Sequence, residues 1–222
     1  MTDPIGNTVQ FSYFAADLST VTDSLSRTTT QFTDAASRLL AVTDPAGQTT
    51  KMAYNALNQV TSTIDPKGKS TLFSYDLNGN LLTVTDANQH ATTYTYDNMD
   101  RLSTRKDALQ NQESHQYDGN GNVTQFTDRR SKVATFSYDG LNRRTFAGYG
   151  TTAGSAYESS VTYTYDSGNR LAQVADTAGG TITRVYNTLD RLTSDTTPNG
   201  TVGYGYDNAG RRTSLTVPGQ SM

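Results

Sequence analysis

The sequence predicts an all-β protein in which tandem β-hairpin repeats form one long, twisted, curling antiparallel sheet. Three observations lead to this prediction. A Tyr followed by Asp or Asn recurs about every 21 residues, a second turn signal lies midway between these tyrosines, and short segments with strand-like alternation connect the turns. Repetition at a fixed period is the sequence signature of a repeat architecture.

The tyrosines set the phase of the repeat. From Tyr54 onwards, successive members lie 21 residues apart, except for steps of 27 before Tyr165 and 20 before Tyr206; Thr33 occupies the position 21 before Tyr54, and Tyr13 lies 20 before Thr33. We therefore expect residues 1–222 to form a single array of about ten units, with degenerate units in 1–43 and an insertion loop at about 145–159. The repeat tyrosines are Tyr13, Tyr54, Tyr75, Tyr96, Tyr117, Tyr138, Tyr165, Tyr186 and Tyr206.

Both anchors of the repeat have the chemistry of turns. An Asp carboxylate accepts hydrogen bonds from the backbone that follows it, Pro presets its own φ, and Gly, Asn or Asp tolerates the left-handed region. Two turns in each unit leave two segments of strand length. The anchors midway between the tyrosines are Asp44 with Gly47, Asp65 with Gly68, Asp86, Asp107, Asp128, and Asp176 with Gly179.

The segments between the turns alternate as strands do. Aromatic residues often lie two apart before the turn, as Phe73 and Tyr75 do, and an aliphatic residue follows six positions after the tyrosine, as Leu81 does. A second apolar residue often lies three further on, as Val84 does, and an odd step cannot keep one face of a regular strand. A β-bulge or partial burial on both faces would explain the spacing, and the sequence leaves both open.

Composition excludes several classes of protein. Hydrophobic residues make up 34% of the chain, Trp and Cys are absent, and the formal net charge is −3. The low hydrophobic content argues against a thick core, whereas the evenly spread aromatic residues and low charge argue against disorder. Without a basic stripe we expect no nucleic-acid partner, and without cysteine there is no disulfide or thiolate metal site. No apolar run is long enough to span a bilayer, and the first residues do not resemble a signal peptide.

The unit Tyr-Asp-x-x-Gly/Asn/Asp-Arg/Asn-Leu resembles the YD repeat of Rhs (rearrangement hotspot) proteins. Good matches begin at Tyr96 and Tyr165, and the resemblance covers essentially the whole chain. It implies a sheet that spirals into a shell, often around a C-terminal toxin domain, in proteins that are secreted or lie at the cell surface. No core segment with self-cleaving Asp residues and no toxin domain follows these repeats. We therefore expect an open shell or spiral segment belonging to a larger Rhs-like polypeptide.

The residue types that can carry chemistry are better explained as parts of the repeat. The carboxylates recur at turns in every unit, whereas a catalytic pair would break the pattern. The segment from Asp118 to Asn122 resembles a calcium loop, but Arg129 stands where an EF-hand needs Glu. His90 and His115 lie in different units and suggest no metal site. We predict no catalytic residue, no metal site and no cofactor.

The insertion supplies the candidate binding residues. Six extra residues enter between Tyr138 and Tyr165, and the resulting loop carries Tyr149 and Tyr157. Loops of this kind often bear function, although repeat arrays also tolerate neutral insertions.

Three functions remain open. The first is a non-catalytic structural segment of a shell or scaffold that encloses or presents a toxin or effector. The second is a carbohydrate- or cell-surface-binding module, in which exposed tyrosines stack on a glycan. A hydrolase ranks last. Tyrosines buried against neighbouring aliphatic residues favour the first, and solvent-facing rows favour the second. Unpaired end strands also predict edge-to-edge self-association.

Overall fold

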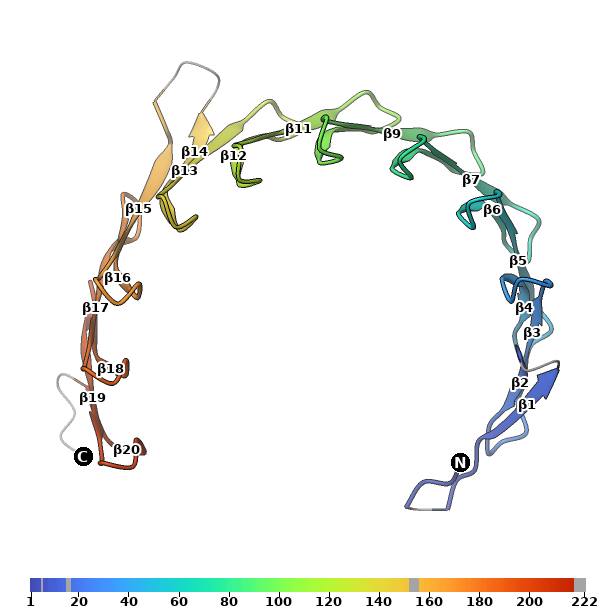
Figure 1. Cartoon of the computed structure of the whole chain (residues 1–222), viewed down its shortest axis with the longest axis horizontal. Coiled ribbons are helices and arrows are strands. Elements are labelled where there is room, and N and C mark those ends of the chain that lie inside the picture. Colours follow the sequence, from blue (N-terminus) through green and yellow to red (C-terminus); the bar gives the residue numbers. More distant parts are fainter. Residues whose placement is uncertain (5, 15–16, 152–155, 218–222) are drawn as a thin grey trace. The chain divides into compact units, whose positions relative to one another are not determined.

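A computed structural model describes residues 1–4, 6–14, 17–151 and 156–217, and its described strands are all antiparallel (Figure 1). The chain divides into two compact units, Met1–Asn111 and Gln112–Met222. Each unit is described by itself below. No helix of the described residues is long and apolar enough to cross a membrane.

The first unit is a meander of ten described strands in which each strand pairs with the next along the chain. Its strands are β1 (Gln10–Phe14), β2 (Asp17–Thr22), β3 (Thr28–Thr33), β4 (Leu39–Thr43), β5 (Thr49–Tyr54), β6 (Val60–Ile64), β7 (Ser70–Tyr75), β8 (Leu81–Thr85), β9 (Ala91–Tyr96) and β10 (Leu102–Lys106).

The second unit has the same connectivity. Its strands are β11 (Gln112–Tyr117), β12 (Val123–Thr127), β13 (Val133–Tyr138), β14 (Arg144–Thr151), β15 (Ser159–Tyr165), β16 (Leu171–Asp176), β17 (Gly180–Tyr186), β18 (Leu192–Thr197), β19 (Gly200–Tyr206) and β20 (Arg212–Thr216). The prediction of tandem hairpins in an all-β, antiparallel sheet is confirmed.

Both kinds of turn share one geometry. In the turn after β7, the Asp76 carboxylate accepts from the backbone N–H groups of Asn78 and Asn80, at 2.9 and 2.8 Å. The turn that begins at Asp44 repeats these bonds with Ala46 and Gln48, each at 2.9 Å. The fourth residue of the turn adopts positive φ, which is why Gly, Asn, Asp, Ser or Gln recurs there.

The turn at Asp176 departs from this pattern. Gly180, rather than the expected Gly179, has the positive φ, of 83°. Asp176 and Gly180 are paired across the β16–β17 hairpin, which shortens the turn and moves the left-handed position one residue along. The prediction that Gly179 would take that position was therefore wrong.

A β-bulge at the repeat tyrosine explains the odd spacing of the apolar residues. Tyr75 lies opposite Leu81 and Ser74 lies opposite Thr83, so Leu82 is an extra residue in β8. The next pair joins Phe73 to Val84, which returns Val84 to the face that carries Tyr75. Of the two explanations left open by the sequence, the bulge is the one observed.

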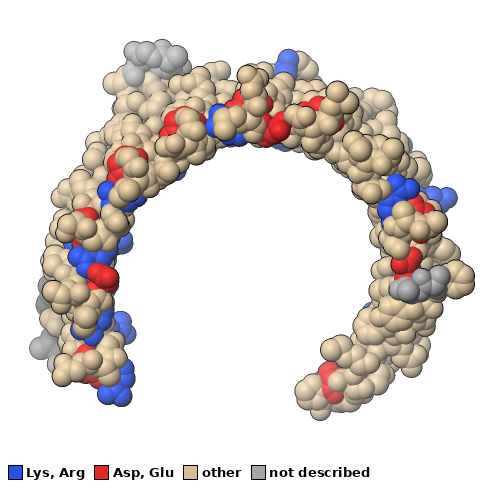
Figure 2. Space-filling model, in the orientation of Figure 1, with Lys and Arg blue, Asp and Glu red and all other residues tan. Residues whose placement is uncertain are grey.

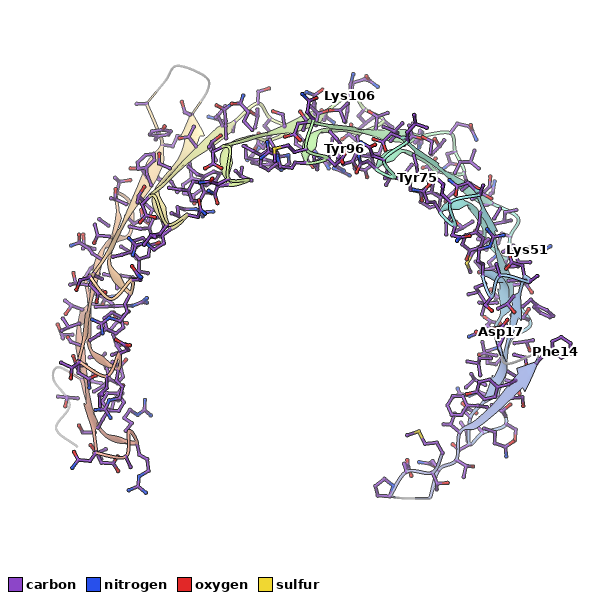
Figure 3. The ribbon with its side chains drawn as sticks, viewed as in Figure 1. Phe14, Asp17, Lys51, Tyr75, Tyr96 and Lys106 are labelled. Carbon is purple, nitrogen blue, oxygen red and sulfur yellow. The ribbon has the colours of Figure 1, made fainter. Side chains whose placement is uncertain are left out.

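Each sheet has two chemically different faces. We call the face that carries the repeat tyrosines the Tyr face and the opposite one the Thr face. In the first unit Tyr75 and Tyr96 project from the Tyr face, whereas Lys51 and Lys106 project from the other side (Figure 3). Ser74 and Thr83 share a hydrogen bond of 2.6 Å on the Thr face.

The sheet is a single layer with little burial. None of the described residues of 1–111 is buried, and the repeat tyrosines after Tyr13 are half-buried. Among the described residues, the buried side chains are Val133, Ala147 and Thr151, all in β13 and β14. Stability must therefore come from contacts between neighbouring repeats rather than from a central core.

Candidate functional site

The hydroxyl groups of the repeat tyrosines bind the preceding repeat. Tyr75 donates to the carbonyl of Val60 at 2.8 Å, a residue fifteen positions earlier that lies at the bulge of its own strand. The hydroxyl group of Tyr75 therefore joins its own repeat to the preceding one. The same bond is made by Tyr54 to Leu39, Tyr96 to Leu81, Tyr138 to Val123, Tyr186 to Leu171 and, fourteen residues apart, Tyr206 to Leu192.

Two repeat tyrosines, Tyr165 and Tyr13, depart from this pattern. Tyr165 donates to Arg144, 21 residues earlier, because the insertion lies between the two repeats. Tyr13, in the degenerate first unit, is 64% exposed. The repeat chemistry is therefore least regular in the first unit of the repeat and at the insertion.

The residue five positions after the tyrosine joins successive turns. Arg170 donates to Asp166 in its own turn at 2.7 Å and to Asp190 in the next turn at 2.6 Å. Its guanidinium also lies 4.8 Å from the ring centroid of Tyr186, the tyrosine of that next repeat. Figure 2 shows acidic and basic side chains side by side along the turns of each unit.

Other repeats make the same connection with different residues. Arg38 contacts Asn55 and Asn58, and Arg143 contacts Asn169. Where Asn replaces Arg, Asn80 donates to Asp100 at 2.7 Å and Asn122 to Asn142 at 2.9 Å. The edge of each sheet therefore carries a series of polar contacts from turn to turn, even where the charge is absent.

These contacts determine the ionisation of the turn carboxylates. Hydrogen bonds from the Arg170 side chain hold the pKa of Asp166 below its ordinary value of 3.8, and those from Arg38 do the same for Asp34. Asp118, the first residue of the calcium-like loop, accepts from Asn120 and Asn122, and its pKa is also lowered. Its oxygens are thus used in forming the turn.

The predicted turn residues lie where the repeat requires them. Asp44, Asp65, Asp86, Asp107 and Asp128 each begin a turn, closed by a bond from the fourth residue of the turn to the carbonyl of the Asp. Gly47 and Gly68 are the positive-φ residues of the first two turns. Among the described residues no cluster of His, Cys, Asp or Glu could hold a metal ion.

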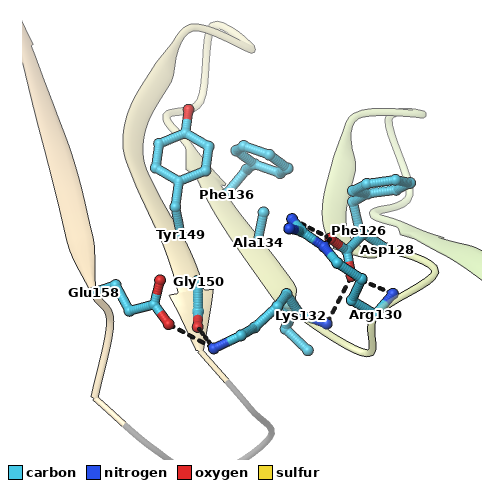
Figure 4. A pocket seen from close by; sticks show the side chains of 10 residues that line it. Phe126, Asp128, Arg130, Lys132, Ala134, Phe136, Tyr149, Gly150 and Glu158 are labelled. Atoms are coloured by element: carbon cyan, nitrogen blue, oxygen red, sulfur yellow. Dashed lines mark hydrogen bonds and ion pairs between the residues drawn. The ribbon is translucent and has the colours of Figure 1, made fainter.

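The insertion forms a groove on the Tyr face of the second unit. Its volume is about 530 Å³, and Phe126, Ala134, Phe136 and Tyr149 supply its apolar part (Figure 4). The rings of Phe136 and Tyr149 meet edge to face with centroids 6.1 Å apart. Aromatic side chains therefore line a concave surface at this place in the second unit.

Ion pairs lie at one end of this groove. Lys132 donates to Glu158 at 2.5 Å and to the carbonyl of Gly150 at 2.9 Å. Arg130 pairs with Asp128 at 3.0 Å. The charges that line the groove therefore balance one another within the described residues.

The two candidate tyrosines of the insertion are not brought together. Tyr149 lies in the groove on the Tyr face and is 36% exposed. Tyr157 packs on the Thr face, where its ring lies 5.4 Å from that of Phe146 and its hydroxyl group shares a 2.6 Å hydrogen bond with Thr135. Residues 152–155 of the predicted loop lie outside the described residues.

Arg144 belongs to the Arg143-Arg144 pair, for which the sequence favours a solvated position beside the turn and leaves an anion contact open. It occupies the position six after Tyr138, where most units carry Leu or Val, and its guanidinium carbon lies 4.7 Å from the centroid of Phe136. No ion pair joins Arg144 to a carboxylate among the described residues. Partial burial opposes its charge, but hydrogen bonding with Tyr138 and the nearby phenols of Tyr149 and Tyr163 raise its pKa. Arg144 also breaks the aliphatic pattern at this position, as Arg212 does opposite Tyr206.

The fold is similar to parts of solved toxin complexes. The structure described as TcdB2-TccC3-TEV aligns with a TM-score of 0.68 and 13% identity over 95% of this chain and 12% of that one. A Tc holotoxin pore of Photorhabdus luminescens, carrying the mutation TccC3-D651A, aligns with a TM-score of 0.55 and 18% identity over 84% of this chain and 13% of that one. TcdB2-TccC3 aligns with a TM-score of 0.56 and 16% identity over 99% and 16% of the two chains.

At these identities the likeness shows a shared fold, and this chain spans less than a fifth of the length of each of those proteins. Curated proteins gave no match to the sequence. The model of the RHS repeat family matches residues 34–71, 75–112, 117–156 and 186–222, together more than half of the sequence. The chain therefore belongs to the RHS repeat family.

Proposed function

We propose that this chain is a length of wall in a larger Rhs-like protein, where it forms part of a β-sheet shell that encloses or presents a toxin or effector. The observation that carries the proposal is that the characteristic side chains of the repeat bond to the protein itself. The tyrosine hydroxyls and turn carboxylates bond to the protein's own backbone and to neighbouring turns. A surface whose characteristic groups are used in self-packing is suited to scaffolding.

The fold comparisons support this proposal. The aligned structures include a Tc holotoxin pore, and the alignments cover most of this chain but only a small part of each toxin chain. A repeat segment of a longer toxin-associated polypeptide accounts for both facts. The proposal includes secretion or surface exposure of that polypeptide, and one continuous array through residues 1–222.

The alternative of a binding module based on the repeat tyrosines receives less support. After Tyr13 these rings are half-buried, and in most units the hydroxyl group is hydrogen-bonded. A glycan would need a free aromatic surface and unsatisfied hydrogen-bonding groups beside it. Glycan binding stays a prediction. It is tested by measuring binding of the wild-type chain to a panel of immobilised glycans, and the Tyr149→Ala and Tyr157→Ala variants should lose any binding that these tyrosines provide.

The shell proposal is tested in the full-length parent polypeptide by limited proteolysis. An effector segment enclosed by an intact wall should resist digestion under native conditions. A variant that loosens the wall, such as Tyr75→Phe combined with Tyr96→Phe, should raise the cleavage rate of that segment several-fold. Rapid digestion of the segment in the folded wild-type protein would contradict enclosure.

Continuity of the array is tested on the chain itself. Small-angle scattering should give an elongated, thin-walled profile, because a single-layered sheet of stacked hairpins cannot collapse around a core. A compact globular profile would contradict the wall model. Measurements over a range of concentrations would also test the predicted edge-to-edge association of the end strands.

A further inference from the structure

The Tyr-face groove of the second unit lies beside Arg144, a cation that forms no ion pair with a carboxylate among the residues that the structure describes. Phe136 belongs to both features: it lines the groove, and it lies beneath the guanidinium of Arg144. In most other repeats the corresponding residue is aliphatic, as Leu81 is opposite Tyr75. Placing Arg there puts a positive charge on an otherwise apolar face.

The other charged side chains around the groove are paired with one another, and Arg144 is not paired with any of them. Arg130 is paired with Asp128 and Lys132 with Glu158, so these four charges offset one another. Arg144 is left with phenyl and phenol rings as neighbours among the described residues. The arrangement is therefore complementary to one negative charge.

The geometry of Arg144 suits a carboxylate. A guanidinium that stacks on an aromatic ring keeps its N–H donors in its own plane, and two of them match the oxygens of a carboxylate. The hydroxyl group of the neighbouring Tyr149 makes no hydrogen bond within the described part of the chain, unlike those of most repeat tyrosines. A volume of about 530 Å³ accommodates one ring-sized group.

We propose that the groove formed by Phe126, Phe136 and Tyr149, together with Arg144, binds a ligand in which an aromatic group stands next to a carboxylate. The ring enters between the groove aromatics, where edge-to-face contacts are favourable. The carboxylate pairs with Arg144. An acidic-aromatic peptide segment and a free aromatic acid share this chemistry, and the site does not depend on the proposed shell function.

The test compares two probes by isothermal titration calorimetry. N-acetyl-L-phenylalaninate carries the ring and the charge, and N-acetyl-L-phenylalanine amide carries the ring alone. We expect the carboxylate to bind about tenfold more tightly, the ratio expected of one charge-assisted pair. Two results would overturn the proposal. One is equal affinity for the two probes, and the other is failure of both probes and of the peptide described below to bind.

Matched variants locate the site. Arg144→Gln should abolish the preference for the carboxylate probe, and Tyr149→Leu should lower the affinity for both probes. Arg212 occupies the corresponding position opposite Tyr206 at the end strand β20, without such a groove, so Arg212→Gln should change nothing. An undiminished preference in folded Arg144→Gln would contradict the assignment. If that variant fails to fold by circular dichroism, Arg144→Lys replaces it and should keep the preference in weakened form.

A second comparison distinguishes the sources of the ligand. The peptide acetyl-Gly-Asp-Phe-Gly-amide presents the same two groups on a backbone. Tighter binding of the peptide than of the free acid would support a polypeptide ligand. The reverse order would support a small aromatic acid, and both outcomes retain the proposed chemistry.

Discussion

The β7–β8 hairpin and the β13–β15 region use the same repeat in different ways. In β7–β8 the side chains form one layer and none of them is buried. In β13–β15 the strand β14 is longer, and Val133, Ala147 and Thr151 are less than a tenth exposed. A regular repeat uses its polar groups on its neighbours, whereas the irregular region adds a few buried side chains and an arginine that forms no ion pair within the described residues.

The largest expected difference between the two regions lies at Gly148. A β-carbon at this position would collide with the ring of Tyr157. Gly148→Ala must therefore displace that ring and break its 2.6 Å bond to Thr135, at a cost of about 1–3 kcal/mol in the free energy of unfolding. Chemical denaturation followed by circular dichroism measures the loss.

Gly140 provides the control for this substitution. It lies in the preceding turn of the same unit, and a β-carbon there would meet nothing within 4 Å. Gly140→Ala should change stability by less than about 0.5 kcal/mol or increase it slightly. Similar losses in both variants would mean that the contact over Gly148 does not distinguish this region.

A smaller effect should separate the tyrosines of the two regions. Tyr75→Phe removes a 2.8 Å bond to the Val60 carbonyl and should cost about 1 kcal/mol. Tyr149→Phe removes a hydroxyl group that has no bond within the described residues, so its unfolding midpoint should stay near that of the wild type. A comparable loss in both variants would contradict the inter-repeat role of the Tyr75 hydroxyl.

The regular region could be predicted from the sequence because its interactions repeat in phase. The recurrence of pairs such as Tyr75-Asp76 identified the turn, and the step from Leu81 to Val84 required either a bulge or burial on both faces, of which the structure contains the bulge. The irregular region could not be predicted in the same way. Tyr149 and Tyr157 appeared equivalent, but an extra residue in the pairing of β13 with β14 and the packing of Tyr157 over Gly148 place them on opposite faces.

The turns provide a comparison within the regular region itself. Gly68 and Gln89 occupy equivalent positions, with φ of 76° and 67°. Because a side chain disfavours this conformation, Gly68→Ala should cost about 1 kcal/mol and Gln89→Gly should gain somewhat less than that. Thermal melts of the two variants should shift in opposite directions, and a destabilised Gln89→Gly would show that its side chain contributes a contact of its own.

The smallest and most specific prediction compares two successive turns of the second unit. Asp166 and Asn187 hold the same place, and each accepts backbone bonds from the second and fourth residues after it. The carboxylate of Asp166 also accepts from Nε of Arg170 at 2.7 Å, whereas the buried Nε of Arg191 has no hydrogen-bond partner within the described residues. Asn187→Asp should supply that partner and raise the unfolding midpoint at pH 7.

The pH dependence of this gain identifies its cause. The pKa of the new carboxyl should be lowered in the folded state, as the pKa of Asp166 is lowered by Arg170 from 3.8. A group whose pKa is depressed by folding stabilises the protein above its unfolded pKa, and the effect is lost as the pH falls through the folded value. The gain should therefore be complete at pH 7 and absent well below pH 3.8. An equal gain at both pH values would mean that the substitution acts through turn propensity rather than through Arg191.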